Sequence, residues 1–152
     1  MDAASAFAAY FAGDLRALDA IPICLTGTPF QNEVWTALRE IRPGSTFGYG
    51  TFAEKLGRAQ AARAVGHANG TNPLSIVVPC HRLVGAGGAL TKYGGGLARK
   101  RWLLDHEARY AAQSEKAPTT LRLPNMKASA TCWRGARSTS DTPARTISAK
   151  RR

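Results

Sequence analysis

Apolar side chains recur every three to four residues in several stretches of this chain, and that spacing predicts helices. The first stretch covers residues 3–12 and ends at Gly13. The second begins at Thr28, which fits an N-cap with a capping box to Gln31, and Pro43 follows its end. One face of this second helix is expected to be buried, because its apolar residues fall at helical spacing: Phe30, Val34, Leu38 and Ile41.

Two short helical stretches follow, separated only by a tight turn. Thr51 and Glu54 fit a second capping box and predict a helix that Gly57 ends, and residues 60–69 predict the next helix. Two short helices joined by such a turn are typical of a helix-turn-helix, although many helical domains that do not bind DNA share this pattern. Arg63 is the long charged side chain among small residues on the second of these helices. That composition fits close approach to another surface, and it equally fits tight helix packing with Arg63 in solvent.

The apolar runs at residues 21–25 and 74–78 are too short for helices and predict strands, the first at a sheet edge because it contains Pro22. After a glycine-rich turn, a last helix is expected to begin near Leu97 and to point three apolar side chains inward: Trp102, Leu103 and Leu104. Beyond about Ala108 the periodicity ends. The rest of the chain is rich in Ser, Thr, Pro, Lys and Arg, which predicts disorder.

Length and composition indicate one soluble domain. The chain has 152 residues, 44% of them hydrophobic, which is enough for a single core. It contains no apolar run of the ~18–20 residues that a transmembrane helix needs. The first residues have no basic leader and carry Asp2 and Asp14, so we expect no secretory signal. The three cysteines are an odd number without a CxxC pair, which argues against a disulfide framework or a zinc ribbon and favours the cytoplasm.

The positive charge of the chain is unevenly distributed. The formal net charge is +11, but residues 1–107 carry 11 Lys and Arg against 8 Asp and Glu, whereas residues 108–152 carry 10 against 2. Most of the excess therefore lies in the last third of the chain. Charge supports nucleic-acid binding only weakly here, because a solvated basic tail without a specific partner has the same composition.

Cys80 carries the clearest candidate chemistry. A cysteine after an apolar run is usually a small core residue, but Cys80 lies between Pro79, which stiffens the chain, and His81. The thiolate is the reactive form of cysteine, and an imidazole that accepts the thiol proton makes it available at neutral pH. Glu107, one turn beyond Leu103 on the predicted last helix, could orient that imidazole as the carboxylate of a catalytic triad does.

The longer pattern around this cysteine resembles one known family. Its centre is Pro79-Cys80-His81-Arg82 after an apolar run, preceded by Asn72-Pro73 and by Arg63-Ala64-Val65-Gly66. Further matches are Gly27-Thr28-Pro29-Phe30, Tyr49, Tyr93, and Trp102-Leu103-Leu104 before Glu107. Residues 27–107 closely resemble the O6-alkylguanine-DNA alkyltransferases, also called methylated-DNA–protein-cysteine methyltransferases.

The resemblance implies a role in the reaction for each matching residue. Cys80 would be the nucleophile, and His81 would take its proton through a water while Glu107 orients His81. Asn72 would be the hinge that ties the recognition helix to the active-site loop. Tyr49 would protonate the departing guanine and also contact DNA.

Substrate and DNA contacts are implied in the same way. Tyr93 would form a wall of the base pocket, and the backbone carbonyls of Cys80 and Leu83 would accept the exocyclic amine of guanine. Gly94 stands where some relatives have a serine that contacts the guanine oxygen, a contact that a backbone N–H could still make. Arg63 would enter the duplex through the minor groove and fill the gap left by the flipped base. Small neighbours would let the helix approach a groove only ~6 Å wide: Ala62, Ala64 and Gly66.

The resemblance also implies the architecture: α+β, mainly helical, with a winged-helix-like helix-turn-helix DNA-binding domain and short strands. Residues 1–26 would be a remnant of the family's separate N-terminal domain and a linker, residues 27–107 the DNA-binding and catalytic domain, and residues 108–152 a basic, disordered tail. The implied partner is double-stranded DNA containing O6-alkylguanine, bound by a monomer without membrane contact. The resemblance implies that the alkyl group would pass irreversibly to Cys80, once per molecule, and that this chemistry would need no metal or cofactor.

Several rival interpretations stay open. A non-catalytic alkylated-DNA-binding protein of the alkyltransferase-like type shares this core but commonly has tryptophan in place of the cysteine. A truncated, inactive relative could have this same sequence, and only an assay separates it from an active protein. A sequence-specific transcription factor would present several polar side chains on its recognition helix, and a cysteine hydrolase would need a distinct oxyanion hole.

His67 and Thr71 stand where the family more often has a small residue and a basic residue, respectively, and these departures would weaken DNA contact modestly.

Overall fold

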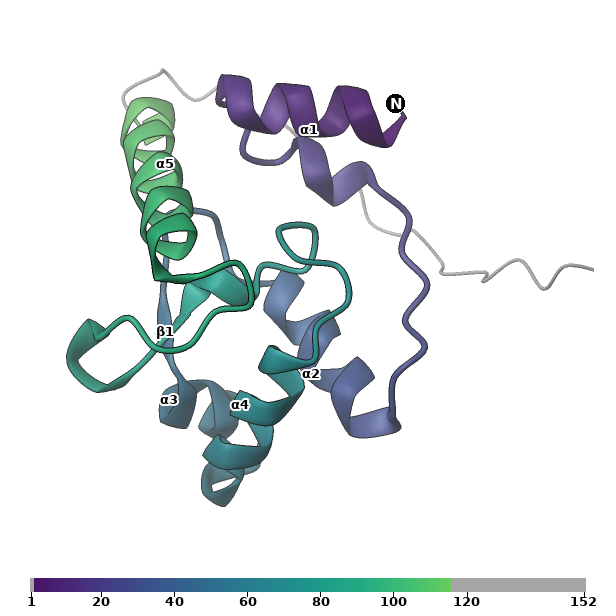
Figure 1. The fold of residues 1–152 in the computed structure, drawn as a ribbon, viewed down its shortest axis with the longest axis vertical. Coiled ribbons are helices and arrows are strands. Elements are labelled where there is room, and N and C mark those ends of the chain that lie inside the picture. The colour runs from purple at the N-terminus through teal and green to yellow at the C-terminus, as the bar shows by residue number, and fades with distance from the viewer. Residues whose placement is uncertain (1, 116–152) are drawn as a thin grey trace, which may run out of the picture.

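The computed structural model describes residues 2–115. Helices dominate this part of the chain: α1 (Ala3–Ala12), α2 (Pro29–Arg39), α3 (Tyr49–Lys55), α4 (Ala62–Gly70) and α5 (Leu97–Glu115). Single turns of 3₁₀-helix lie between them: η1 (Ala17–Ala20), η2 (Ala59–Ala61), η3 (Cys80–Arg82) and η4 (Ala86–Gly88). The strands β1 (Phe47–Gly48) and β2 (Leu83–Val84) pair in parallel. Figure 1 shows α2, α3 and α4 grouped at one end and α1 with α5 at the other, so the expected mainly helical α+β class is confirmed.

Helix α2 lies where the sequence predicts it. The Thr28 side chain accepts a hydrogen bond from the Gln31 backbone N–H, and the Gln31 side chain accepts one from the Thr28 N–H, which completes the capping box. The buried face of α2 enters the main core through three residues: Val34, Trp35 and Leu38. The Trp35 indole N–H donates to the Ala68 carbonyl at 2.8 Å and ties α2 to α4.

The helix-turn-helix consists of α3 and α4, with η2 in the turn between them. Helix α3 begins at Tyr49, so the predicted capping box of Thr51 and Glu54 is wrong. The reason is that β1 runs straight into the helix, and Gly48 serves as the N-cap without a side-chain hydrogen bond. The inner faces of both helices join the main core: Phe52, Ala53, Val65 and Ala68.

The two predicted strands are also wrong, because their apolar side chains pack onto the core from loops. Residues 21–25 belong to no strand of the described structure, and Ile23 and Leu25 contact the main core as partly buried side chains. Residues 74–78 form a turn instead. Within it, Ile76 has a left-handed φ of 76°, which strand geometry does not allow and β-branched residues rarely adopt.

Helix α5 differs from its prediction in length and in its buried face. It continues through Ala108 to Glu115, so the predicted disordered tail does not begin at residue 108, and residues 116–152 of that tail lie outside the described residues. Leu103 is buried as expected, but Trp102 is 53% exposed. Adjacent residues of a helix point about 100° apart, and here Leu103 takes the direction of the core while Trp102 points away from it. Trp102 stacks instead on His106 at the surface, with ring centroids 5.0 Å apart.

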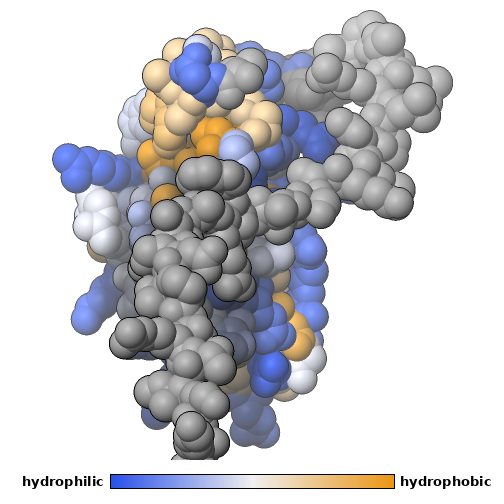
Figure 2. Space-filling model, turned by 90° about the vertical axis from the view of Figure 1, so that its right-hand side faces the viewer, coloured by the Kyte–Doolittle hydropathy of each residue, from blue (hydrophilic) through white to orange (hydrophobic). Residues whose placement is uncertain are grey.

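Helix α1 packs against α5. It ends at Gly13, whose φ of 114° suits a glycine C-cap, as the sequence predicts. A second, smaller core joins the two helices: Ala6, Tyr10, Leu18 and Leu103. In Figure 2 the hydrophobic colour gathers at the top of the molecule, where Figure 1 places α1. Among residues 2–115, none of the helices has the length and apolar content needed to span a membrane.

Candidate active site

Cys80 is the first residue of η3 and carries a free thiol that is 4% exposed. Two backbone hydrogen bonds shape its turn: the Cys80 N–H donates to the Val78 carbonyl at 2.8 Å, and the Arg82 N–H donates to the Pro79 carbonyl at 3.0 Å. These bonds fix the backbone of the turn that carries the cysteine.

His81 follows the cysteine and is completely buried. Its Nε2 lies 2.9 Å from Oε1 of Glu107, so the structure brings the two residues together. A carboxylate only accepts hydrogen bonds, so Nε2 carries the proton and Nδ1 does not. Nδ1 is buried and has no hydrogen-bond partner among residues 2–115. Burial lowers the pKa of His81 against the opposing effect of Glu107, which makes the imidazole a neutral proton acceptor near pH 7.

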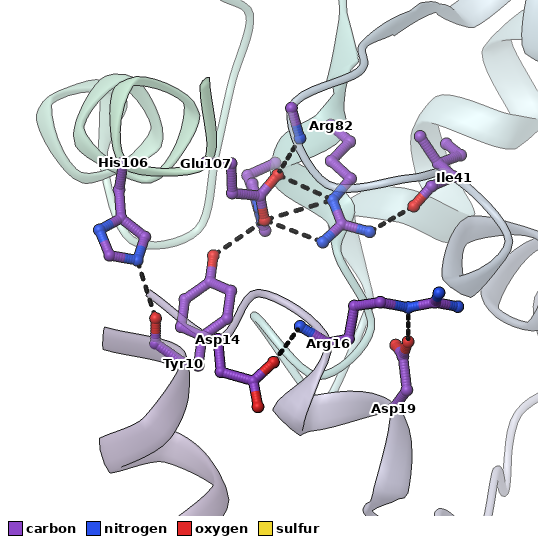
Figure 3. A network of polar contacts seen from close by, with 10 residues as sticks. Tyr10, Asp14, Arg16, Asp19, Ile41, Arg82, His106 and Glu107 are labelled. Atoms are coloured by element: carbon purple, nitrogen blue, oxygen red, sulfur yellow. Dashed lines mark hydrogen bonds and ion pairs between the residues drawn. The ribbon is translucent and has the colours of Figure 1, made fainter. Parts of the chain in front are cut away.

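Three further residues donate to the Glu107 carboxylate (Figure 3). Arg82 contacts both oxygens, with Nη2 2.8 Å from Oε1 and Nε 3.0 Å from Oε2. The Tyr10 hydroxyl donates to Oε1 at 2.8 Å, and the Gly44 N–H donates to Oε2 at 3.2 Å. Burial alone would raise the pKa of Glu107, but the hydrogen bonds and charges of His81 and Arg82 outweigh it and hold the pKa well below its usual range. The carboxylate is therefore ionised and fixed in one orientation.

Helix α1 reaches this network through Tyr10. Burial, together with the charge of Glu107, raises the pKa of Tyr10, so its hydroxyl stays protonated and donates. His106 Nε2 lies 3.0 Å from the Tyr10 backbone carbonyl, so consecutive residues of α5 hold both ends of Tyr10 (Figure 3). Sequence reasoning missed Tyr10, because no local signal marks a tyrosine in an alanine-rich helix as the partner of a residue 97 positions away.

Lys100 lies buried on α5 and was also missed. Its Nζ donates to the Leu83 carbonyl at 2.6 Å and to the Thr91 carbonyl at 3.4 Å. Burial lowers the pKa of Lys100, whereas the negative charge of a Cys80 thiolate acts in the opposite direction. A signal did exist, because Lys100 and Glu107 are seven residues apart and so share a helix face. The Leu83 carbonyl, implied as a guanine acceptor, thus already accepts a hydrogen bond from Lys100.

On the other side of the cysteine turn, α3 and α4 border a cavity of about 540 Å³. The residues that line it come from α3, α4 and the loop before α5: Tyr49, Ala62, Gly66, His67, Asn69, Gly70, Thr71, Thr91 and Lys92. Asn69 is 6% exposed, and its Nδ2 lies 3.3 Å from both the Tyr49 hydroxyl oxygen and the Cys80 carbonyl oxygen. The Thr91 hydroxyl lies 3.3 Å from the Tyr49 hydroxyl. Asn69 and Thr91 were not singled out from the sequence.

Asn72, Tyr93 and Gly94 differ in how firmly the structure holds them. Asn72 closes the loop before the cysteine: its Nδ2 donates to the Val78 carbonyl at 2.8 Å, and its Oδ1 accepts from a backbone N–H of the same loop at 2.9 Å. Tyr93 contacts both core clusters, and burial together with the charge of Cys80 raises its pKa to about 12. Gly94 is exposed, and a side chain there would meet open space.

Tyr49, which is expected to contact DNA, begins α3, and the other residues expected to do so form two sets on α4. Arg63 and Ala64 are exposed on its outer surface. Ala62 and Gly66 line the cavity, and a Cβ atom on Gly66 would lie 3.9 Å from the Tyr49 ring. The small residues therefore make room for the cavity as well as a smooth outer surface. Residues 2–115 contain no group of three or more His, Cys, Asp and Glu side chains that could hold a metal ion.

Comparison with known proteins decides the family. The family described as 6-O-methylguanine DNA methyltransferase, DNA binding domain, matches residues 29–109. This chain belongs to that family. A methylated-DNA--protein-cysteine methyltransferase of Shigella flexneri is 59% identical over 98 residues, which cover 64% of this chain and 57% of the relative. A protein of the same name from Mycolicibacterium paratuberculosis is 56% identical over 106 residues, or 70% of this chain and 64% of the relative. The chain thus spans less than two thirds of either relative.

Solved structures of methylguanine methyltransferases share this fold. Mycobacterium tuberculosis OGT in complex with DNA aligns with a TM-score of 0.64 at 48% identity, over 71% of this chain and 66% of the relative. The O6-methylguanine-DNA methyltransferase of Pyrococcus kodakaraensis aligns with a TM-score of 0.56 at 33% identity, over 68% and 61%. These similarities confirm the expected DNA-binding domain fold.

Proposed function

We propose that this protein repairs O6-alkylguanine in double-stranded DNA by transferring the alkyl group irreversibly to Cys80. The observation that carries the proposal is the buried, free cysteine followed by a neutral His81 that is oriented by Glu107 and has an unpaired Nδ1. The relatives support it by name as methylated-DNA--protein-cysteine methyltransferases, and the M. tuberculosis OGT structure contains DNA.

The reaction is an in-line displacement at the alkyl carbon. Nδ1 of His81 takes the thiol proton through a water, and the charge of Glu107 stabilises the imidazolium that forms. The C–S bond to Cys80 forms as the C–O6 bond breaks, and the electron pair leaves with guanine. Tyr49 donates a proton to the departing base, which makes it a better leaving group. Because the thioether product is not readily hydrolysed, each molecule acts once.

The extruded base would lie between the cysteine turn and the loop before α5. Tyr93 would form one wall of its pocket, and the carbonyls of Cys80 and Leu83 would accept its exocyclic amine. The backbone N–H of Gly94 would contact the guanine oxygen. Asn72 supports this arrangement, because its two side-chain hydrogen bonds fix the loop that leads from α4 to the cysteine.

DNA would be bound through the outer surface of α4 by a monomer in the cytoplasm. Arg63 is exposed on this helix and would replace the flipped base in the duplex. Extruding a base costs a few kcal/mol, least where alkylation has already weakened its pairing. The basic residues beyond α5 would add attraction for any DNA.

Intact mass measured after incubation with duplex DNA containing O6-methylguanine tests the proposal. We expect a gain of one methyl group per chain, located on Cys80, and no gain with Cys80→Ala, which should still bind the duplex. Binding of alkylated DNA without any gain of mass would support instead a non-catalytic lesion-binding protein. Neither binding nor transfer would identify an inactive relative.

A further inference from the structure

The neighbours of Asn69 fix the orientation of its amide. Nδ2 lies 3.3 Å from the Cys80 carbonyl oxygen and 3.3 Å from the Tyr49 hydroxyl oxygen. A carbonyl only accepts, so the nitrogen of the amide must face Cys80, and its second hydrogen goes to Tyr49. Oδ1 of Asn69 is buried without a hydrogen-bond partner among residues 2–115. If the amide were reversed, Oδ1 could accept a hydrogen bond from Tyr49, but it would also face the Cys80 carbonyl oxygen, which has no hydrogen to donate. The Cys80 carbonyl therefore keeps the amide in the orientation described.

This orientation decides where the Tyr49 proton can point. Because Asn69 donates to the phenolic oxygen, the phenolic proton is not directed at Asn69. The Thr91 hydroxyl donates to the same oxygen at 3.3 Å. With two donors on the oxygen, the proton of Tyr49 is available to another partner. All three residues line the same cavity beside the cysteine turn, so a molecule in that cavity can receive the proton.

Buried groups also hold Thr91 in place. Lys100 Nζ donates to the Thr91 carbonyl at 3.4 Å, and the same ammonium donates to the Leu83 carbonyl at 2.6 Å. Leu83 is the first residue after η3, the turn that begins with Cys80. One buried side chain therefore sets the loop that carries Thr91 relative to the cysteine.

We propose that Asn69 and Thr91 are positioning residues that make the Tyr49 hydroxyl the proton donor to the departing base. This inference rests on the proposed function. As the C–S bond forms and the C–O6 bond breaks, the electron pair moves onto guanine and the proton of Tyr49 moves onto the base. Asn69 Nδ2 and Thr91 Oγ1 then donate to a tyrosinate.

The two hydrogen bonds gain strength at that moment. Hydrogen bonds to an ionised oxygen are shorter and stronger than those to a neutral one, so both lower the transition state more than the ground state. The tyrosinate regains a proton from the His81 imidazolium through water. The net result is that the thiol proton of Cys80 ends on guanine.

The test compares two methyl donors that give the same product on Cys80. Duplex DNA containing O6-methylguanine releases a base that needs a proton, whereas iodomethane releases iodide, which does not. Methylation of Cys80 in the full chain is followed by the mass of its peptide after digestion. Asn69→Leu and Thr91→Val keep nearly the same volume without the donor, and Thr36→Val, exposed on α2, is the matched control. We expect Asn69→Leu to slow the duplex reaction ~10- to 100-fold. Thr91→Val should slow it less, and the iodomethane rates should stay unchanged.

A second comparison excludes a structural effect through the contact of Asn69 with the Cys80 carbonyl. In a Tyr49→Phe background no hydroxyl remains to be oriented, so Asn69→Leu should slow the duplex reaction by less than about twofold further. Equal slowing with iodomethane, a full additional loss in the Tyr49→Phe background, or an unchanged duplex rate would overturn the inference. If the unsubstituted protein reacts with iodomethane but not with the duplex, the proposed function itself fails, and this inference with it.

Discussion

The two sides of the cysteine turn are built differently. On the α5 side, Glu107 is completely buried and accepts hydrogen bonds of 2.8–2.9 Å from Tyr10, His81 and Arg82. On the α4 side, the Tyr49 hydroxyl has two contacts of 3.3 Å and borders a cavity. The His81–Glu107 pair, which would take the thiol proton, therefore has a fixed geometry before substrate binds. The group that serves the leaving base keeps room to adjust, and its hydrogen bonds can shorten when charge develops.

The difference extends from reactivity to stability. The Glu107 network joins α1, α5, η3 and the segment after α2, so breaking it disturbs contacts between distant parts of the chain. A buried charge left without its partner is costly, whereas a long hydrogen bond beside a cavity can be replaced by one to water. Changes on the α5 side should therefore lower stability and all reactions of Cys80. Changes on the α4 side should affect mainly the reaction with DNA.

Glu107→Gln should have the largest effect of the substitutions on either side. The amide keeps the shape but removes the charge that orients His81 and pairs with Arg82. We expect alkylation to slow ~10³-fold or more and the free energy of unfolding to fall by about 3–5 kcal/mol. Single-turnover rates and urea unfolding measure the two effects. Glu40→Gln, which alters an exposed ion pair with Lys55, is the control and should change neither. A Glu107→Gln protein with normal rate and stability would remove the basis of the comparison.

Arg63→Ala should act only on the α4 side. If Arg63 holds the extruded base out of the stack, repair of duplex DNA should slow ~10- to 1000-fold, because extrusion costs a few kcal/mol. Repair of the free O6-alkylguanine base needs no extrusion and should change much less. Both rates are measured with the same protein preparation. Equal loss on both substrates would make Arg63 structural, and near-normal duplex repair would show that it is merely solvated.

Tyr10→Phe, on the α5 side, should have a smaller effect than Arg63→Ala, and it should lower stability and slow both substrates equally. It removes one hydrogen bond to an ionised carboxylate, so the free energy of unfolding should fall by about 1.5–3 kcal/mol. Duplex DNA and the free base should be repaired more slowly by the same factor of a few. Tyr110→Phe, later on α5, is the matched control. A change confined to the duplex reaction would show that α1 does not act through Glu107.

Stability should also fall gradually as the solution is acidified. The pKa of His81 is lowered from 6.5 in the folded state. Its contribution to the free energy of unfolding is therefore fully present above pH 6.5 and is lost as the pH falls. The lowered pKa of Glu107 extends this loss below pH 4.5. Each unit of difference in pKa corresponds to about 1.4 kcal/mol. Urea unfolding across this range measures the slope, and stability that rises on acidification would contradict the assignment of the buried network.

Local signals predicted the helices, and long-range packing decided the rest of the fold. The capping box of Thr28 and the glycine at position 13 act on their own helices, and both boundaries were predicted correctly. The start of α3 was wrong because β1 pairs with β2, more than thirty residues later in the chain. The strand predicted for the apolar run at 74–78 was wrong because a short loop that packs apolar side chains on the core has the same composition as a buried strand.

The candidate site divides in the same way. Cys80, His81 and Glu107 could be named from one motif and one helix position, and the structure brings them together. Asn69 and Tyr10 could not, because each acts through a contact that exists only after the chain has folded. Asn69 lies three residues before Asn72, which the resemblance did identify, and nothing in the sequence separates a buried asparagine from a solvated one.

The central claim is that Cys80 is both the catalyst and the final acceptor of the alkyl group. A titration of the protein with an excess of duplex DNA containing O6-methylguanine tests it most directly, with repaired guanine and protein mass measured together. We predict that repair stops at or below one guanine per protein and that every repair event appears as one methyl group on Cys80. Repair that continues beyond one guanine per protein, or repair without methylation of Cys80, would contradict the account.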